Sequence, residues 1–455
     1  MPRPFHPPAT YRSRGEDSSV DQDGMSRTTL DNGLTVLIKE MHHAPVATFW
    51  VWYGVGSRNE TPGLTGASHW VEHMQFKGTP QFPGDVLDRL ISREGGLWNA
   101  MTFYDWTAYY EVMPAARIDL GLQLEADRML NSEFDPAEVE SERTVILSER
   151  SGSENSPSWL LYEEMLSLAF RLHPYRTTVI GERVDLERMS RDDLYNHYRR
   201  YYVPNNATAV LVGDVDTQEY LAKIEEWFGG IPAGEPVPEV YRPEPPQYGE
   251  RRVVVNREGE TPYVSVAYRA YAVTHPDFLA LTVLDSILAG ASSLNFMGTA
   301  DTSNKTSRLY RALVETELAA GVGGGMVATI DPYLYSITAT VRNGRAPEEV
   351  EAAIHAEIDA LRAGSIREEE FEKARKQAKA LFAYDSESVS SQGFWLGFSE
   401  TLVGNYAWFD DYLDRLMAVT LDDVQRVAAD IFDPNKRIVG WYVPTGSSPT
   451  EGEDE

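Results

Sequence analysis

The order of apolar and polar positions along the chain predicts alternating strands and helices over most of its length. The first regular segment is LDNGLTVLIKE, where Asn32-Gly33 is typical of a tight turn between two strands. The next run, VATFWVWYGVGS, is rich in β-branched and aromatic residues and predicts a buried strand. Helical periods follow in SHWVEHMQFKG and GDVLDRLISREGG, and Gly95-Gly96 predicts where the second helix ends.

The pattern continues in the same way to residue 230. The aromatic and threonine-rich segment NAMTFYDWTAYYEVMP predicts one long strand, and ATAVLVGDV predicts another. Between them, residues 116–130 and 136–152 have the helical period. Periodicity alone therefore predicts a fold of mixed strands and helices.

Residues 231–250 interrupt this pattern near the midpoint of the chain. The segment holds six prolines and shows no clear period, which is typical of a linker. Strand and helix patterns resume after it, from YVSVAYRA through PDFLALTVLDSILAG and SRLYRALVETE to YLYSITATV. The glycine-rich run at 321–325, GVGGG, lacks the order of a dinucleotide-binding fingerprint and predicts a turn or a flexible loop.

The sequences on the two sides of this linker resemble each other. RDDLYNHYRRYYVPNNATAVLVGDV matches LDDVQRVAADIFDPNKRIVGWYV, with 11 residues from Asp193 to Pro204 and again 11 from Asp423 to Pro434. The offset of 230 residues also places 138–143 over 368–373, both in acidic helical segments. An acidic helix followed by Pro-Asn and a strand is a common local arrangement, but two matches at one offset favour a duplication.

We therefore expect two related domains with short flanking segments. The predicted division is a flexible N-terminal arm over 1–25, a first domain over 26–230, a proline-rich linker over 231–250, a second domain over 251–445 and an acidic tail over 446–455.

The amino-acid composition excludes several classes of function but says little about the fold. The formal charge of −29 on 455 residues repels phosphate backbones and argues against nucleic-acid partners. The chain has no cysteine, which excludes disulfide frameworks, cysteine-based zinc sites and cysteine nucleophiles. The first 24 residues lack the apolar core of a signal peptide. The sequence also has no apolar run long enough to predict a membrane span. We expect a cytoplasmic protein, or a periplasmic one if a leader has been removed from the sequence.

The motif that indicates a metal-binding catalytic site is His69-Trp70-Val71-Glu72-His73. Residues four apart share one face of a helix, so His69 and His73 can bind one metal ion, with Glu72 at the edge of that face. A zinc ion with three protein ligands and one open position lowers the pKa of its water toward about 7, and the carboxylate can then accept the proton. Taken alone, the motif also fits a solvated helix with two surface histidines.

A third ligand is needed, and the segment EVESERTVILSERSG offers two candidates. Glu142 and Glu149 are seven residues apart and therefore share a helix face. Buried carboxylates require a charge partner, which a metal ion would supply. Without the histidines, the same segment is typical of an ordinary glutamate-rich helix.

These residues and their flanks resemble the pitrilysin family of zinc metallopeptidases, also called inverzincins, whose motif is HxxEH. The chain is most similar to the shorter branch that includes mitochondrial processing peptidase and its bacterial relatives. The resemblance covers nearly the whole chain, in family order, through LDNGLTVLI, GLTGASHWVEHMQFKGT, GGLWNAMTFYDWTAYYEV, ERTVILSE, HPYRTTVIGE and YYVPNNATAVLVGDV. It implies an α+β fold of two homologous domains, each a mostly antiparallel sheet covered by helices.

The resemblance also implies a role for each matching residue of the site. His69, His73 and Glu149 match the ligands of one zinc ion per chain, and Glu72 matches the general base. Glu142 matches a second carboxylate that orients the site.

One part of the family pattern is missing. In its second half the family usually carries an Arg and, seven residues later, a Tyr, which bind the substrate carbonyl and stabilise the tetrahedral intermediate. The aligned residues here are Val314 and Gly321, and the 230-residue offset places Lys379 opposite Glu149. The chain therefore resembles a zinc-bearing subunit without the Arg/Tyr pair.

The resemblance implies a zinc-dependent endopeptidase that hydrolyses peptides or small unfolded polypeptides in a closed chamber. Asn99 and Ala100 match the strand edge that binds the substrate backbone. Family members of this length form half of the chamber, so we expect a heterodimer with a homologous subunit carrying Arg/Tyr, rather than a homodimer. A non-catalytic structural or assembly subunit is the alternative, against which the complete set of ligands and base argues; a maturase dedicated to one peptide is a further possibility.

Overall fold

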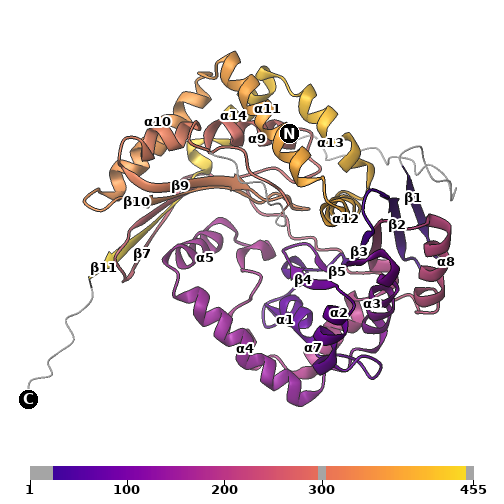
Figure 1. The fold of residues 1–455 in the computed structure, drawn as a ribbon. Helices are drawn as coiled ribbons and strands as arrows, with labels where there is room; N and C mark the ends of the chain where they lie inside the picture. Colours follow the sequence, from indigo (N-terminus) through magenta and orange to yellow (C-terminus); the bar gives the residue numbers. More distant parts are fainter. Residues whose placement is uncertain (1–23, 296–303, 447–455) are drawn as a thin grey trace, which may run out of the picture.

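The computed structural model describes residues 24–295 and 304–446, which form two β-sheets with helices packed on them (Figure 1). Each sheet is mostly antiparallel, so the predicted α+β fold is confirmed. Most of the predicted N-terminal arm and nearly all of the predicted acidic tail lie outside the described residues. None of the helices in the described ranges combines the length and the apolar character needed to cross a lipid bilayer.

The first sheet has the strand order β1-β2-β6-β3-β5-β4. Strands β2 and β6 are parallel, and the other neighbours are antiparallel. The central strand β3 is buried on both faces, which explains its nearly continuous apolar sequence. The strands are β1 (Met25–Thr29), β2 (Thr35–Glu40), β3 (Val46–Tyr53), β4 (Leu97–Thr102), β5 (Thr107–Pro114) and β6 (Ala207–Gly213).

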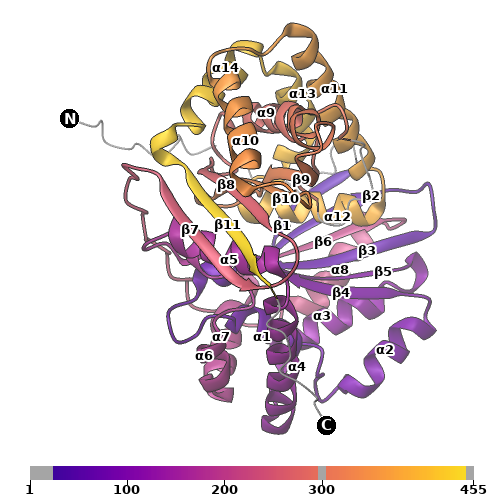
Figure 2. The ribbon, with the colours of Figure 1, turned by 90° about the vertical axis from the view of Figure 1, so that its left-hand side faces the viewer.

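The second sheet has the order β7-β11-β8-β10-β9, with β7 and β11 as its parallel pair. Figure 2 shows β11 beside β7, with α5 behind them. The strands are β7 (Arg251–Glu258), β8 (Tyr263–Arg269), β9 (Ala319–Met326), β10 (Leu334–Val341) and β11 (Ile438–Thr445).

Helices cover both sheets. Those of the first half are α1 (Ala67–Met74), α2 (Gly84–Arg93), α3 (Asp119–Asn131), α4 (Pro136–Glu154), α5 (Pro157–Ala169), α6 (Arg183–Arg188), α7 (Arg191–Tyr201) and α8 (Thr217–Phe228). Those of the second half are α9 (Phe278–Leu288), α10 (Pro347–Arg362), α11 (Glu368–Asp385), α12 (Val389–Phe398), α13 (Ala407–Ala418) and α14 (Leu421–Ile431).

The predicted relationship between the two halves is visible in the strand pairing. Strands β2, β6, β3, β5 and β4 of the first sheet have the order and the directions of β7, β11, β8, β10 and β9 in the second. The helices α7 and α14 also begin alike, with capping boxes formed by Ser190 and Asp193 in one and by Thr420 and Asp423 in the other. The same capping box therefore occurs at the start of two equivalent helices, 230 residues apart in the sequence.

Three of the predicted elements differ in the structure. The single strand expected over NAMTFYDWTAYYEVMP is two strands, β4 and β5, which pair with each other around the turn at 103–106. The run at 321–325 is not a loop but part of strand β9, because β10 supplies partners for its backbone. The helix expected over SRLYRALVETE is mainly a short π-helical segment, η5 (Tyr310–Val314).

Each half places one helix on the sheet of the other half. Helix α5 packs on β7 and β11, and the equivalent helix α12 packs on β3 and β6 (Figure 1). Glycines make this approach possible, because a Cβ atom at Gly393 would lie 2.5 Å from the Trp50 ring and one at Gly397 would lie 2.0 Å from the Trp52 ring. This reciprocal exchange ties the two halves into one body.

We expect Gly397→Ala to lower the free energy of unfolding by about 1–3 kcal/mol, because the added methyl group overpacks a buried contact with Trp52. Gly152→Ala in α4 is the matched control, since a Cβ there meets no atom within 4 Å. The control should be neutral or stabilising, because alanine favours a helix over glycine. Urea denaturation of both variants measures the difference, and equal stabilities would contradict the tight contact between α12 and the first sheet.

Candidate metal centre

Two helices bring the predicted metal ligands together. His69 and His73 stand one turn apart on α1, and Glu149 faces them from α4. The Oε2 atom of Glu149 lies 3.9 Å from His69 Nε2 and 3.7 Å from His73 Nε2. One ligand atom from each of the three residues lies within 4.8 Å of the others, and no second His, Asp and Glu group in the described residues has this geometry.

The orientation of α1 follows from its apolar residues. Trp70, Val71 and Met74 are buried in the core of the first half, which turns the opposite face of α1 toward α4. The guanidinium of Arg143 on α4 also lies 4.7 Å from the centre of the Trp70 ring. Apolar packing thus sets the face of α1 on which both imidazoles lie.

The protonation of His69 suits metal binding. Burial, together with the nearby His73, lowers the pKa of His69 to about 3, so this imidazole is neutral at neutral pH. For His73, burial acts in the same direction, but the hydrogen bond to Glu142 and the charges of Glu149 and Glu72 outweigh it and raise the pKa. The raised pKa means that a proton competes with a metal ion for this second ring more than for His69.

Glu142 holds His73 from behind. Its Oε1 atom lies 2.8 Å from His73 Nδ1, and this hydrogen bond is the largest cause of the lowered pKa of Glu142. The ammonium of Lys77 forms an ion pair with Glu142 and lies 3.8 Å from Glu138. A proton held on Nδ1 by this carboxylate leaves the Nε2 lone pair of His73 directed at Glu149.

Glu72 lies next to these groups, at the wall of a pocket. Its side chain is buried, and burial raises its pKa while hydrogen bonding to Thr102 of β4 opposes the rise. The pocket has a volume of about 590 Å³ and is lined by Glu72, His73, Phe76, Lys77, Gly84, Asp88, Asn99, Glu138 and Glu142. A carboxylate with a raised pKa at the wall of a cleft is suited to proton transfer.

The donor set fits a zinc ion. Two imidazole nitrogens and one carboxylate oxygen are a common zinc set, and three protein ligands leave a fourth position open. The neutral ring of His69 and the carboxylate behind His73 are the features that such a site requires.

Asn99 and Ala100 lie on β4, which is the last strand of the first sheet in the described part of the chain. Its pairing with β5 leaves the other edge of β4 turned away from the sheet. Asn99 lines the same pocket as Glu72, and its side-chain oxygen accepts a hydrogen bond from the Ala100 N–H at 2.9 Å. The two residues and the metal-ligand candidates therefore belong to one region of the molecule.

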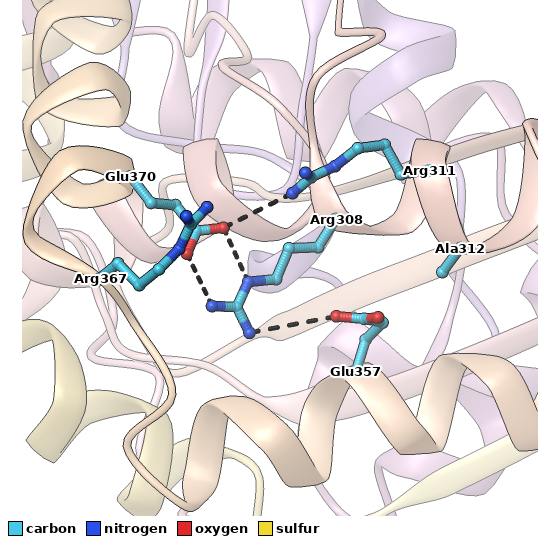
Figure 3. A pocket seen from close by; sticks show the side chains of 6 residues that line it. All are labelled: Arg308, Arg311, Ala312, Glu357, Arg367 and Glu370. Carbon is cyan, nitrogen blue, oxygen red and sulfur yellow. Dashed lines mark hydrogen bonds and ion pairs between the residues drawn. The ribbon is translucent and has the colours of Figure 1, made fainter.

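The residues at the positions of the family's Arg/Tyr pair, Val314 and Gly321, cannot perform the function of that pair. Val314 ends η5, and Gly321 lies in β9 with no side chain. The arginines upstream are engaged elsewhere: Arg308 binds Glu370 through two hydrogen bonds of 2.8 and 2.7 Å, and Arg311 lies 3.9 Å from the same carboxylate. Figure 3 shows both guanidinium groups directed at Glu370, in a pocket between η5, α10 and α11.

Lys77 and Thr102 also lie at the site, although no sequence motif indicated them. Lys77 stands four residues after His73, so helical spacing alone could have placed it near the motif. Nothing in the spacing could have found Thr102, because the fold brings β4 against α1 from a distant part of the sequence.

The chain is similar to known peptidases of one family. The family model described as "Insulinase (Peptidase family M16)" matches residues 35–183, and the one described as "Peptidase M16 inactive domain" matches residues 188–378. The zinc protease PqqE of Helicobacter pylori is 30% identical over 91% of this chain and 92% of its own length. The mitochondrial-processing peptidase subunit beta of Lentinula edodes is 26% identical over 88% of this chain and 86% of its own length.

A solved structure supports the same assignment of the fold. The crystal structure of a protease from Helicobacter pylori superposes with a TM-score of 0.86 and 28% sequence identity, over 92% of this chain and 99% of the other. The likeness thus spans both sheets.

Proposed function

The chain belongs to the insulinase (M16) family of peptidases, and on this premise we propose that it is a zinc-dependent endopeptidase acting on peptides or small unfolded polypeptides. The observation that carries the proposal is the convergence of His69 Nε2, His73 Nε2 and Glu149 Oε2 within 4.8 Å beside the buried Glu72. In the family such a chain forms half of a closed chamber.

The chain's own residues have separate tasks in this proposal. His69, His73 and Glu149 would hold one zinc ion, which would supply a Lewis acid that lowers the pKa of water toward about 7. Glu72 accepts the proton of the attacking water and passes it to the leaving amine. Glu142 keeps the His73 ring in the orientation that faces Glu149.

Substrate binding is assigned to strand β4. A peptide that adds to its free edge gains main-chain hydrogen bonds beside the pocket lined by Glu72 and Asn99. Such binding does not depend on one side chain, so we infer selection by size and flexibility of the substrate more than by sequence. The site lies in the proposed catalytic domain, 26–230, and the described residues of the proposed second domain, 251–445, hold no group of converging metal ligands.

We further propose that the active form is a heterodimer. This chain has Val314 and Gly321 where the Arg/Tyr pair would stand, and Arg308 and Arg311 are held by Glu370. A homologous partner chain would then supply the two groups that bind the substrate carbonyl.

Mixing the two chains tests the function and the pairing together. We expect this chain alone to hydrolyse an internally quenched peptide at least tenfold more slowly than its mixture with a homologue that carries Arg/Tyr. A chelator should abolish the activity of the mixture, and added zinc should restore it. Full activity of the single chain would refute the heterodimer, while a mixture that is insensitive to chelation would refute the zinc mechanism.

The alternative is a non-catalytic structural or assembly subunit. The family model whose description contains "inactive" covers residues 188–378, whereas the proposed ligands lie within residues 35–183, which match the model described as a peptidase. Metal analysis separates the two functions: about one zinc ion per chain after gentle purification supports the enzyme, and none supports the structural subunit.

A further inference from the structure

Helix α1 carries three of the proposed site residues, yet it is short. It has eight residues and begins after Gly66, which has no side chain to cap it and adopts a φ of 90°. Isolated helices of this length do not persist in water, so contacts from outside must fix where α1 begins and how it is oriented. The first turn of α1 is where these contacts can be found.

Glu60 supplies them. Its carboxylate accepts hydrogen bonds from the backbone N–H groups of Gly66, at 2.7 Å, and Ser68, at 2.8 Å. The side chain is buried, so water does not compete for these bonds. A carboxylate at the start of a helix also interacts favourably with the helix dipole. Glu60 therefore takes the part of the missing side-chain cap, although it stands six residues before Gly66.

Two further contacts fix the first turn of α1, one at Gly66 and one at Ser68. A Cβ atom at Gly66 would lie 2.5 Å from the Ile180 carbonyl oxygen, so the loop before α1 is pressed against residues 180–181. On the adjacent side, the hydroxyl of Ser68 lies 3.1 Å from Nε2 of the buried His197 on α7. These contacts restrict sliding of α1, and Glu60 restricts the rotation of its first turn.

We propose that Glu60 is a positioning residue of the metal centre, because its carboxylate fixes the orientation in which α1 presents His69 and His73 to Glu149. The ligands come from two separate helices, so a small rotation of α1 changes the distances from Glu149 to both imidazoles. Sites of this kind tolerate displacements of only about 0.5 Å. The inference rests on the proposed zinc function and adds to it a residue that contacts neither metal nor substrate.

The test is Glu60→Gln, in which the amide nitrogen can no longer accept one of the two N–H groups. We expect the Kd for zinc, measured by competition with a chromophoric chelator, to rise about 10–100-fold. We also expect the visible absorption bands of the Co²⁺-loaded protein to shift, because they report the geometry of the ligands. A purely structural role of Glu60 would lower the thermal stability without moving these bands.

Glu244→Gln is the matched control. This carboxylate also accepts backbone N–H groups, from Arg171 at 2.7 Å, Leu172 at 2.9 Å and His173 at 3.1 Å, but it does not touch α1. The control should lose stability and keep the zinc affinity and the Co²⁺ spectrum of the unsubstituted protein. Equal changes in both variants would overturn the proposal.

Two further outcomes are decisive. Unchanged zinc affinity and an unchanged Co²⁺ spectrum in Glu60→Gln would overturn the role of Glu60 and leave the proposed function intact. If that variant does not fold, Glu60→Asp, which keeps the charge but is shorter by one methylene, is measured in the same way and judged by the same criterion. Failure of the unsubstituted protein to bind either metal would overturn the proposed function, and the role of Glu60 with it.

Discussion

Glu72→Gln is expected to lower the rate of peptide hydrolysis by about 10²–10⁴-fold while the zinc ion stays bound. Glutamine has nearly the shape of glutamate but cannot accept the proton of the attacking water. Glu72 is buried beside His73 and does not belong to the group of three converging ligand atoms, so its replacement should leave the metal ligands in place. Single-turnover rates of the assembled complex, together with zinc content, measure the two effects separately.

Glu140→Gln is the control for this experiment. Glu140 lies on α4, is two-thirds exposed and pairs with Arg143 on the protein surface. Its replacement should change neither the rate nor the zinc content, because it reaches neither the pocket nor the ligands. A Glu72→Gln variant that turns over as fast as the Glu140→Gln control would exclude Glu72 as the base.

His73→Ala is expected to remove the metal itself, and with it all zinc-dependent activity. The substitution deletes one of the two proposed imidazole ligands and also removes the His73 ring to which Glu142 is hydrogen-bonded. We expect the zinc content to fall from about one ion per chain to less than a tenth of that value after dialysis. Elemental analysis and the loss of Co²⁺ absorption bands measure the effect.

His42→Ala provides the matched comparison. His42 also has carboxylate neighbours, with Nδ1 2.8 Å from Asp214 and Nε2 3.2 Å from Glu40, but it is exposed and belongs to no group of converging ligands in the described residues. The zinc content of this variant should equal that of the unsubstituted protein. Retention of zinc by His73→Ala, at the level of the His42→Ala control, would contradict the assigned ligand set.

Among the described residues only the first half carries a candidate metal centre, and two features of the second half account for this difference. Helix α9 follows β8 as α1 follows β3, but all eleven residues of α9 are buried, so it has no free face for metal ligands. Lys379 of α11 also stands at the position that the 230-residue offset assigns to Glu149. The described part of the second half thus has the strand order of the first but no group of converging ligand atoms.

The sequence by itself determined the features that depend on neighbours along the chain. The turn at Asn32-Gly33, the capping boxes 230 residues apart and the shared helix face of His69 and His73 follow from local geometry, which short-range spacing encodes. Periodicity alone predicted only mixed strands and helices, and the α+β class of two homologous domains was implied by the family resemblance. The roles of the site residues stay predictions, and the substitutions above test those of Glu72 and His73.

Only the tertiary structure decided the features that depend on contacts between distant segments. The run at 321–325 is a strand because β10 pairs with its backbone, and Gly324 is required there because a Cβ atom would lie 2.8 Å from that of Ala289. The packing of α5 and α12 on the opposite sheets and the link from Thr102 to Glu72 likewise join residues that no local period relates. Hydrophobic burial selects these contacts over the whole chain at once, and a pattern read along the sequence does not contain that information.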